Sequence, residues 1–361
     1  MKLPVRIALS LVCAALVLAA PFTLSSPNLL GEARMQMQEQ LEGDWDLDDG
    51  WDPEADDDDW LESGLMKLLF PAANAEEEAE DAEEDEQAEE KTYSLPIDLS
   101  AGLEPNPAAF TEAGYEDDSI RVQMETREED GVIWRIAWVE VASPTQLRTG
   151  IAGTIAKPGE KKVRTIAESC NAVVALNGDY FKNNPTKTSF EYRMGQKIRS
   201  NTNKTKDMLI IDENGGFHIV MALEKTKQQD AIKAVTADHK IVNAFTFGPA
   251  LVSEGKVIKT DKHYGYNPEG KEPRSAIGQT GPLSYVFVVA EGRGKSAGVT
   301  HQQLANFMGD SLHCVAAYNL DGGGSATLVF NGKIYNKLGG SERQLSDIIY
   351  FATAVDPKEW K

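Results

Sequence analysis

Cysteine is scarce in this chain. Only three cysteines occur among 361 residues, and Cys13 lies in an N-terminal apolar run, which leaves Cys170 and Cys314. A single pair cannot form the disulfide framework of a small secreted scaffold, and the spacing of these two matches no zinc pattern. They either pair or stay free, and we favour free thiols because buried free cysteines are common.

Clusters of lysine and arginine with interleaved aromatic residues are also lacking, which argues against nucleic acid as a partner. Charge is instead concentrated in residues 41–90, which carry 23 of the 57 Asp and Glu residues but one of the 36 Lys and Arg residues. Like charges repel, and the segment has little apolar surface, so we predict that residues 27–91 form a disordered acidic linker. Its three tryptophans among aspartates suggest calcium or a basic partner as an alternative to a plain spacer.

No apolar run reaches the 20 or so residues of a spanning helix. The longest one near the N-terminus, residues 7–20, follows Lys2 and Arg6 in the layout of a secretory signal. We therefore predict a signal peptide or an N-terminal anchor over residues 1–26. The protein is expected to be exported to the periplasm, the cell envelope or the medium, with membrane contact only through an uncleaved anchor.

The remaining residues, 92–361, are predicted to form the globular domain. The run "GVIWRIAWVEVASP" alternates like a half-buried strand, and "VRTIAESCNAVVALNGDYF" indicates a helix over 163–169 and a buried strand over 172–177. "DMLIIDENGGFHIV" and "ATLVFNGKIYN" are typical of hairpins, and "THQQLANFMGDSL" is typical of a helix. Strands outnumber helices, so we predict an α+β fold with a mixed, largely antiparallel sheet and a few helices.

Three predicted buried strands end in a polar residue followed by glycine. Their ends read Asn177-Gly178-Asp179, Glu291-Gly292-Arg293 and Asp321-Gly322-Gly323-Gly324-Ser325. Ligands bind beyond strand ends, where loops present polar groups without burying them unpaired. If the strands are neighbours, the three ends converge on one pocket.

These segments carry a family resemblance. "NGDYF", "RSAIG", "AEGRGKSAGVTHQQLA" and "YNLDGGGSATLVFNG", in this order, resemble the phosphodiester glycosidase family, and the likeness covers roughly residues 115 to 355, including "RQLSDIIYFATA". It implies hydrolysis of a sugar-1-phosphodiester, such as an N-acetylglucosamine-1-phosphodiester, at the anomeric carbon. The transition state is then oxocarbenium-like, and stabilising the phosphate matters more than a strong general acid.

The resemblance also implies catalytic residues. Asp321 is the expected essential carboxylate, as base, nucleophile or metal ligand, and Glu291 is a second carboxylate where relatives often have Asp. Arg274 matches the arginine of the family and is the expected bidentate phosphate clamp. Calcium held by Asp179 and Asp321 is one expectation, and a reaction that requires no cofactor is the other.

Further residues are expected to bind substrate: Asn177, Asp179, Arg293, Thr300, Gly322, Gly323, Gly324 and Ser325. The glycines are expected to form an anion nest or to bring backbone close to the sugar, while Ser325 donates a hydroxyl or caps a turn. Thr300 matches a family threonine, although helix capping explains it as well. Tyr180 or Phe181 either stacks on a sugar or lies in the core. His301 has no counterpart in the pattern, so we expect it at the surface.

Together these features predict an exported hydrolase that acts on a glycosyl phosphodiester in a surface polysaccharide or teichoic-acid-like polymer. Two alternatives remain at this point. One is transfer of the sugar to another acceptor during exopolysaccharide processing, and the other is a non-catalytic glycan-binding protein of the envelope.

Overall fold

The computed structural model describes residues 101–183, 189–202, 205–222, 225–260 and 262–360. All of them belong to the second of two structural units, Glu90–Lys361. The predicted signal or anchor (1–26) and the predicted acidic linker (27–91) lie outside the described residues. Among the helices described, none is both long and apolar enough to cross a membrane.

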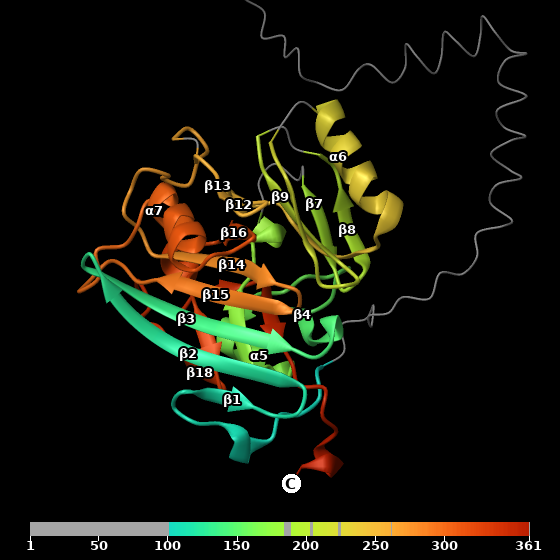
Figure 1. Ribbon diagram of the computed structural model, residues 1–361, viewed down its shortest axis with the longest axis vertical. Coiled ribbons are helices and arrows are strands. Elements are labelled where there is room, and N and C mark those ends of the chain that lie inside the picture. The colour runs from blue at the N-terminus through green and yellow to red at the C-terminus, as the bar shows by residue number, and fades with distance from the viewer. Residues whose placement is uncertain (1–100, 184–188, 203–204, 223–224, 261, 361) are drawn as a thin grey trace, which may run out of the picture. The chain divides into compact units, whose positions relative to one another are not determined.

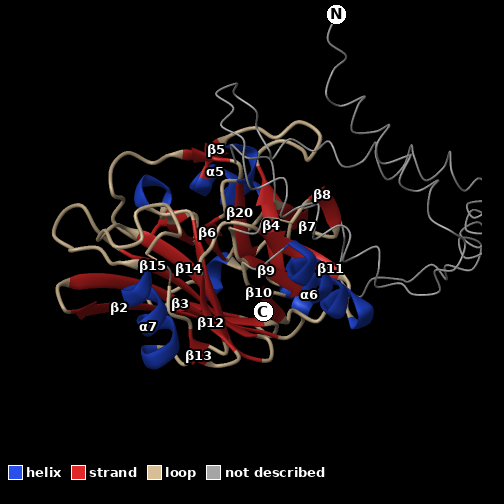
Figure 2. Ribbon diagram, turned by 90° about the horizontal axis from the view of Figure 1, so that it is seen from above, coloured by secondary structure: helices blue, strands red, loops and turns tan. Residues whose placement is uncertain are grey.

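Antiparallel sheets make up most of the described part (Figures 1 and 2). The largest contains, in spatial order, β1 (Gly114–Glu116), β2 (Ile120–Glu129), β3 (Val132–Val141), β15 (Ser284–Ala290), β14 (Arg274–Gly281), β16 (Ala316–Leu320), β12 (Ala250–Ser253) and β13 (Lys256–Val257). A second contains β10 (Phe217–Val220), β9 (Met208–Asp212), β11 (Ile241–Phe245), β7 (Phe190–Arg193) and β8 (Gln196–Ser200). A third contains β18 (Lys333–Ile334), β17 (Leu328–Phe330), β6 (Val174–Asn177), β20 (Asp347–Phe351) and β4 (Leu147–Ile151), and β19 (Gln344–Leu345) pairs with β5 (Lys161–Lys162).

Helices are few and cover the outer faces of these sheets. The α-helices described are α5 (Val163–Ser169), α6 (Lys225–Asp238) and α7 (His301–Asn306), which continues into a π-helical turn over Phe307–Ser311. Short 3-10 turns occupy Pro107–Ala109, Pro144–Gln146, Phe181–Asn183, Gly323–Ser325 and Pro357–Glu359. The predicted α+β fold, with largely antiparallel sheets and few helices, is confirmed.

Strand β15 shows how the sequence builds the core. Alternate side chains point to opposite faces of a strand, and those of Tyr285, Phe287 and Val289 enter the main core, which residues of all three large sheets share. Val286 and Val288 face the other way, into the core under α7. Both faces are buried, which explains why this strand is a nearly continuous apolar run.

The segment that joins β15 to β16 contains helix α7. Helix α7 begins at a capping box in which the Thr300 hydroxyl accepts from the Gln303 N–H and the Gln303 side chain accepts from the Thr300 N–H. Because β15 and β16 are both antiparallel to β14, they run in the same direction on either side of it. Their carboxyl ends therefore lie at the same edge of the sheet.

Most predicted elements are present at their predicted places. The helix over 163–169 is confirmed, and the strand predicted from 172 begins at Val174. Both hairpins are confirmed, and in the second one Asn331 and Gly332 have the positive φ values of a tight turn. Helix α6 was not predicted, because its sequence is mostly polar and few of its side chains pack on the sheet.

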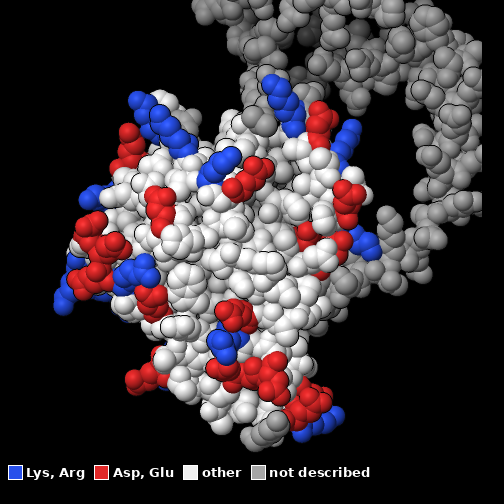
Figure 3. All heavy atoms as spheres, viewed as in Figure 1, with Lys and Arg blue, Asp and Glu red and all other residues white. Residues whose placement is uncertain are grey.

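The two described cysteines are free and buried, and they lie in different cores. The expectation of free thiols is thus confirmed. On the face shown in Figure 3, acidic and basic side chains form small mixed groups around a broad neutral area. A charged ligand that approaches this face meets no extended field of one sign.

Truncation of a side chain in the main core is expected to be costly. Phe287 is fully buried on the central strand β15, so Phe287→Ala should lower the free energy of unfolding by about 3–5 kcal/mol. Val315→Ala is the matched control, because Val315 is 43% exposed, and it should change stability by no more than about 0.5 kcal/mol. Urea denaturation followed by tryptophan fluorescence measures both, and equal losses would contradict this placement of the core.

Candidate active site

The three polar strand ends meet. The Asn177 side-chain N–H at the end of β6 donates to the Asp321 carbonyl at 2.7 Å, and the Asp321 N–H points to the Gly178 carbonyl at 3.4 Å. The end of β15 joins them through Arg293, since a Cβ placed on Gly323 would lie 3.3 Å from Arg293 Nη2. The three strand ends therefore lie next to one another, and the pocket expected between them stays a prediction.

Asp321 is the carboxyl group that directly follows β16 at this junction. Burial raises its pKa to about 6, and the negative charge of Asp179 acts in the same direction. The Ser325 hydroxyl, the Arg343 guanidinium and the Gly322 N–H oppose this by favouring the ionised form. A carboxyl group with such a pKa exists in both forms near neutral pH, as acid–base or nucleophilic catalysis requires.

The three glycines after Asp321 allow close packing. A Cβ on Gly322 would lie 2.7 Å from the Pro273 carbonyl, and one on Gly324 would lie 2.7 Å from Arg343 Nε. Gly323 has a φ of +60° and donates its N–H to the Pro273 carbonyl at 2.7 Å. The predicted anion nest therefore lacks the Gly323 N–H, and the run serves mainly to bring backbone against Pro273 and Arg343.

Arg274 lies in a different setting from the predicted phosphate clamp. It is buried, and its guanidinium donates to the carbonyls of Val299, Tyr266, Asn267 and Gly270 and to His301 Nε2. These five acceptors match the five N–H groups of the side chain. The geometry thus gives Arg274 a structural task, which is to fix the loop that carries Tyr266.

His301 is fully buried, so the predicted surface position is wrong. Burial lowers its pKa to about 3, and the charges of Arg274 and Lys206 act in the same direction. The ring is therefore neutral and accepts a hydrogen bond from Arg274 at 2.7 Å. The sequence contained no local signal of this, because a helix capped by Thr300 looks the same whichever face is buried.

Glu291 and Asp321 do not form a carboxylate pair. Their strands are separated by β14, which places the two backbones about 10 Å apart. Glu291 Oε1 accepts from Arg135 Nε at 2.7 Å and from the Lys337 N–H at 2.8 Å, and the side chain is buried. Glu291 therefore anchors a loop, whereas the predicted role was catalytic.

Asn177 and Thr300 also use their polar groups within the protein. Asn177 is fully buried, and its amide oxygen accepts from the Thr327 N–H while its N–H groups tie the ends of β6 and β16 together. The Thr300 hydroxyl caps α7. Both residues position the site, and neither geometry indicates direct contact with a substrate.

A fully buried charge cluster lies next to the strand ends. Arg193 on β7 bonds to Asp179 at 2.7 Å, to Asp347 at 2.8 Å and to Glu191 at 3.2 Å, and all four side chains are essentially inaccessible to solvent. Three carboxyl groups surround one cation, so burial and mutual repulsion hold the pKa of Glu191 well above its usual range and raise that of Asp347 to about 7. The sequence motifs point to Asp179 but not to its three partners.

The cluster bears on the expected calcium site. The two oxygens of Asp179 accept from Arg193 Nη2 and from the Thr246 N–H, so a guanidinium already neutralises this carboxylate. Asp179 and Asp321 are close enough for their charges to interact. However, a site that already contains a buried arginine is a poor fit for a second cation.

Three residues of the site are not marked by any predicted site motif. Tyr266 is 48% exposed, stacks on Phe247 with ring centroids 4.6 Å apart, and has its pKa raised by burial and by Asp321. Lys206 Nζ lies 4.0 Å from the centroid of the Tyr266 ring, and burial lowers its pKa to about 8. Arg343 is the first residue of "RQLSDIIYFATA", and this segment was the one signal that pointed to it.

Aromatic side chains complete the site. Tyr180 is 37% exposed with a φ of +73°, a backbone conformation that is costly for a tyrosine. Tyr180 is one of the neighbours that raise the pKa of Tyr266, after burial and the charge of Asp321. Phe181 is buried against the Arg193 guanidinium and belongs to the core.

Comparison with known proteins agrees with this architecture. The family model described as phosphodiester glycosidase (NAGPA) matches residues 170–352, which is half of the chain and includes all three strand ends. The chain belongs to the phosphodiester glycosidase family. The uncharacterized protein YomE of Bacillus subtilis (strain 168), derived from prophage SPbeta, is 28% identical over 194 residues, which are 52% of this chain and 29% of that protein. The chain thus matches less than a third of the length of this relative.

Solved structures share the fold of this chain. The zebrafish N-acetylglucosamine-1-phosphodiester alpha-N-acetylglucosaminidase (NAGPA) catalytic domain, auto-inhibited by its pro-peptide, has a TM-score of 0.51 at 18% identity and covers 70% of this chain and 87% of its own. A hypothetical protein from Synechocystis has a TM-score of 0.51 at 16% identity, covering 64% and 62%. The predicted family and its sheet-dominated fold are confirmed.

The buried charge cluster yields a prediction about stability and pH. Because the pKa of Glu191 is raised in the folded state, its contribution to stability falls as pH rises above the unfolded value. Glu191→Gln removes this loss. The free energy of unfolding of the variant, measured relative to that of the wild type, should therefore rise between pH 5 and pH 8, by at most about 1.4 kcal/mol per pH unit.

Urea denaturation at each pH measures this gain. Glu128→Gln is the matched control, because Glu128 is exposed on β2, and its difference from wild type should be constant with pH. A constant difference for Glu191→Gln would mean that Glu191 is ionised in the folded protein.

Proposed function

We propose that this protein hydrolyses a sugar-1-phosphodiester in a surface glycan or teichoic-acid-like polymer. The observation that carries the proposal is Asp321, a carboxyl group with a pKa of about 6 beside Arg343 at the junction of three strand ends. Family membership supports the reaction class. The N-terminal basic and apolar pattern supports action outside the cytoplasm, which mass spectrometry of the mature N-terminus tests.

In the proposed reaction Asp321 acts in its ionised form at the anomeric carbon, either as the nucleophile or as the base that activates water. Arg343 supplies a positive charge for the phosphodiester. It is exposed, and Nη1 lies 3.4 Å from the Ser325 hydroxyl. Arg293, whose Nε donates to Glu272 at 2.7 Å, lies beside Gly323 and adds a second guanidinium at the edge. The leaving phosphate monoester is then stabilised mainly by charge.

The sugar is proposed to bind against the two exposed tyrosines. Tyr180 is 37% exposed, and Tyr266 is 48% exposed and feels the charge of Asp321. Phe247 and Lys206 cover the ring faces of Tyr266, so this residue offers its edge and its hydroxyl group to the sugar. Aromatic side chains with a few polar groups are typical of small-molecule sites. Lys206 Nζ lies over the Tyr266 ring. Its ammonium group helps to hold Tyr266 in place through this cation–π contact.

Removal of the Asp321 charge tests the proposal. Asp321→Asn keeps the shape of the side chain and should lower kcat for sugar release by at least about 100-fold. The substrates are synthetic methyl diesters of α-N-acetylglucosamine-1-phosphate and α-glucose-1-phosphate. Asp310→Asn is the matched control, because Asp310 is exposed in the turn after α7, and it should leave the rate unchanged.

Each result of this experiment discriminates between the alternatives. Equal rates for Asp321→Asn and wild type would remove Asp321 from the mechanism. Sugar found on an added acceptor alcohol would indicate transfer. Binding of the diesters by calorimetry, without release of sugar or methyl phosphate, would support a glycan-binding protein.

The pH dependence of the reaction should report the environment of Asp321. Activity that requires the ionised carboxylate falls as pH drops through about 6. Arg343→Gln removes a positive charge that favours the ionised form, so this acidic limb should move to higher pH, and KM for the diester should rise. Arg121→Gln, on an exposed arginine paired with Glu116, is the control. A limb that stays in place would contradict the effect of the Arg343 charge on Asp321.

A further inference from the structure

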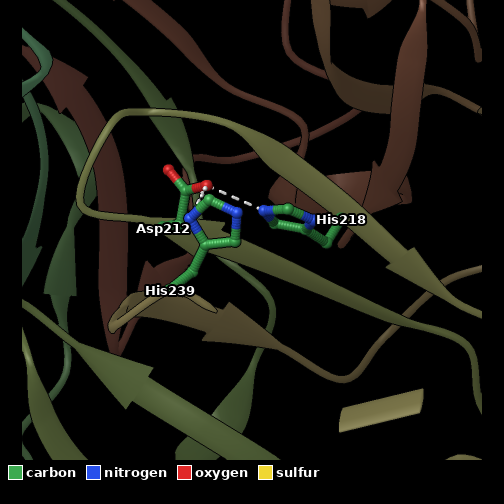
Figure 4. A group of neighbouring side chains, drawn as sticks. All are labelled: Asp212, His218 and His239. Carbon is green, nitrogen blue, oxygen red and sulfur yellow. Dashed lines mark hydrogen bonds and ion pairs between the residues drawn. The ribbon is translucent and has the colours of Figure 1, made fainter. Parts of the chain in front are cut away.

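A second cluster of polar side chains lies near β9 and β10, in the five-stranded sheet that also contains β11, β7 and β8. It is separate from the strand ends described above. Asp212 at the end of β9, His218 on β10 and His239 directly after α6 point toward one another (Figure 4). Asp212 Oδ2 lies 2.8 Å from His218 Nε2 and 3.3 Å from His239 Nδ1. All three potential ligand atoms lie within 4.8 Å of one another.

The local fold fixes the carboxylate of this cluster. Asp212 Oδ1 accepts from the N–H groups of Asn214 and Gly216 at 2.8 Å each, within the turn that joins β9 and β10. These bonds orient the side chain so that Oδ2 faces the two imidazoles. The Asp212 carboxyl group is buried, while the histidine side chains are 28% and 33% exposed, so an ion can reach the cluster from solvent.

One atom of the cluster lacks a hydrogen bond. Within the described part of the chain, His239 Nδ1 is buried without a hydrogen-bond partner, although Asp212 Oδ2 is only 3.3 Å away. A buried ring nitrogen without a partner is costly. It can be satisfied by an ion placed between it and the carboxylate.

We propose that Asp212, His218 and His239 bind a divalent transition-metal ion, with Zn²⁺ as the best fit. Bonds of 2.0–2.1 Å in a tetrahedron place ligand atoms about 3.3 Å apart. The His239–Asp212 distance already has this value, and the His218–Asp212 distance needs to open by about 0.5 Å. Imidazole ligands disfavour calcium and magnesium, which prefer oxygen.

The ion would join three consecutive segments of the chain. Asp212 and His218 belong to the β9–β10 hairpin, and His239 follows α6 immediately before β11. The end of this mostly polar helix would then be fastened to the sheet by the metal. Three protein ligands leave a fourth position for water. The ion is thus a stabilising element of this sheet, independent of Asp321 and of the proposed reaction.

Metal binding by the full-length protein tests this inference. After treatment with EDTA and dialysis, Zn²⁺ titration should show one equivalent per chain that depends on this cluster, and saturating Zn²⁺ should raise Tm by about 5 °C. Co²⁺ should give the strong visible absorption of a four-coordinate site with nitrogen ligands. His239→Ala should weaken binding by more than about 100-fold and abolish both signals.

His313→Asn is the matched control, because His313 is exposed with a positive φ that asparagine tolerates, and it should retain both signals. Metal bound by the acidic residues 41–90 has oxygen ligands, gives no such Co²⁺ spectrum and is equal in the two variants. If His239→Ala is unstable in EDTA, the Co²⁺ spectrum of His218→Asn decides. An equivalent of Zn²⁺ unaffected by these changes, or no Zn²⁺-dependent signal in wild type, overturns the proposal.

Discussion

The buried guanidinium of Arg193 is the interaction on which the rest of the site depends. It extends from β7 in one five-stranded sheet to Asp347 on β20 and Asp179 after β6 in the other, and it also donates to the Ala244 carbonyl on β11. A buried charge is tolerated only when it is paired and hydrogen-bonded. Because Asn177 at the end of β6 holds Asp321, the joint between these two sheets also determines where Asp321 lies.

Close backbone approach is the second constraint. The Cβ that any other residue would add at Gly178 would collide with the Asp347 carboxylate, and at Gly322 it would press on the Pro273 carbonyl. These two glycines let the ends of β6 and β16 pack against their neighbours. The same closeness partly shields Asp321 from solvent, and burial is the largest cause of its raised pKa. The close packing of the backbone therefore also raises the pKa of the Asp321 carboxyl group.

The arginines near the site are of two kinds. Some use their N–H groups in hydrogen bonds within the protein, and others are exposed and keep N–H groups accessible to a ligand. Arg193 and Arg274 are buried with their N–H groups bound to acceptors of the protein. Arg343 is exposed beside Gly324 and Ser325, and Arg293 lies near the Gly323 backbone at the edge. A phosphate can be bound only by guanidinium groups that have N–H groups to spare.

The sequence by itself determined the features that depend on near neighbours: the hairpin at Asn331-Gly332, the cap at Thr300, the alternation of β3, and the order of polar strand ends that identifies the family. These depend on local φ preferences and side-chain periodicity. Only the tertiary structure decided that Arg274 and His301 bind each other inside the protein and that Asp179 meets Arg193. Whether a polar side chain is free for a ligand depends on which partners reach it from distant segments, and no local pattern encodes that.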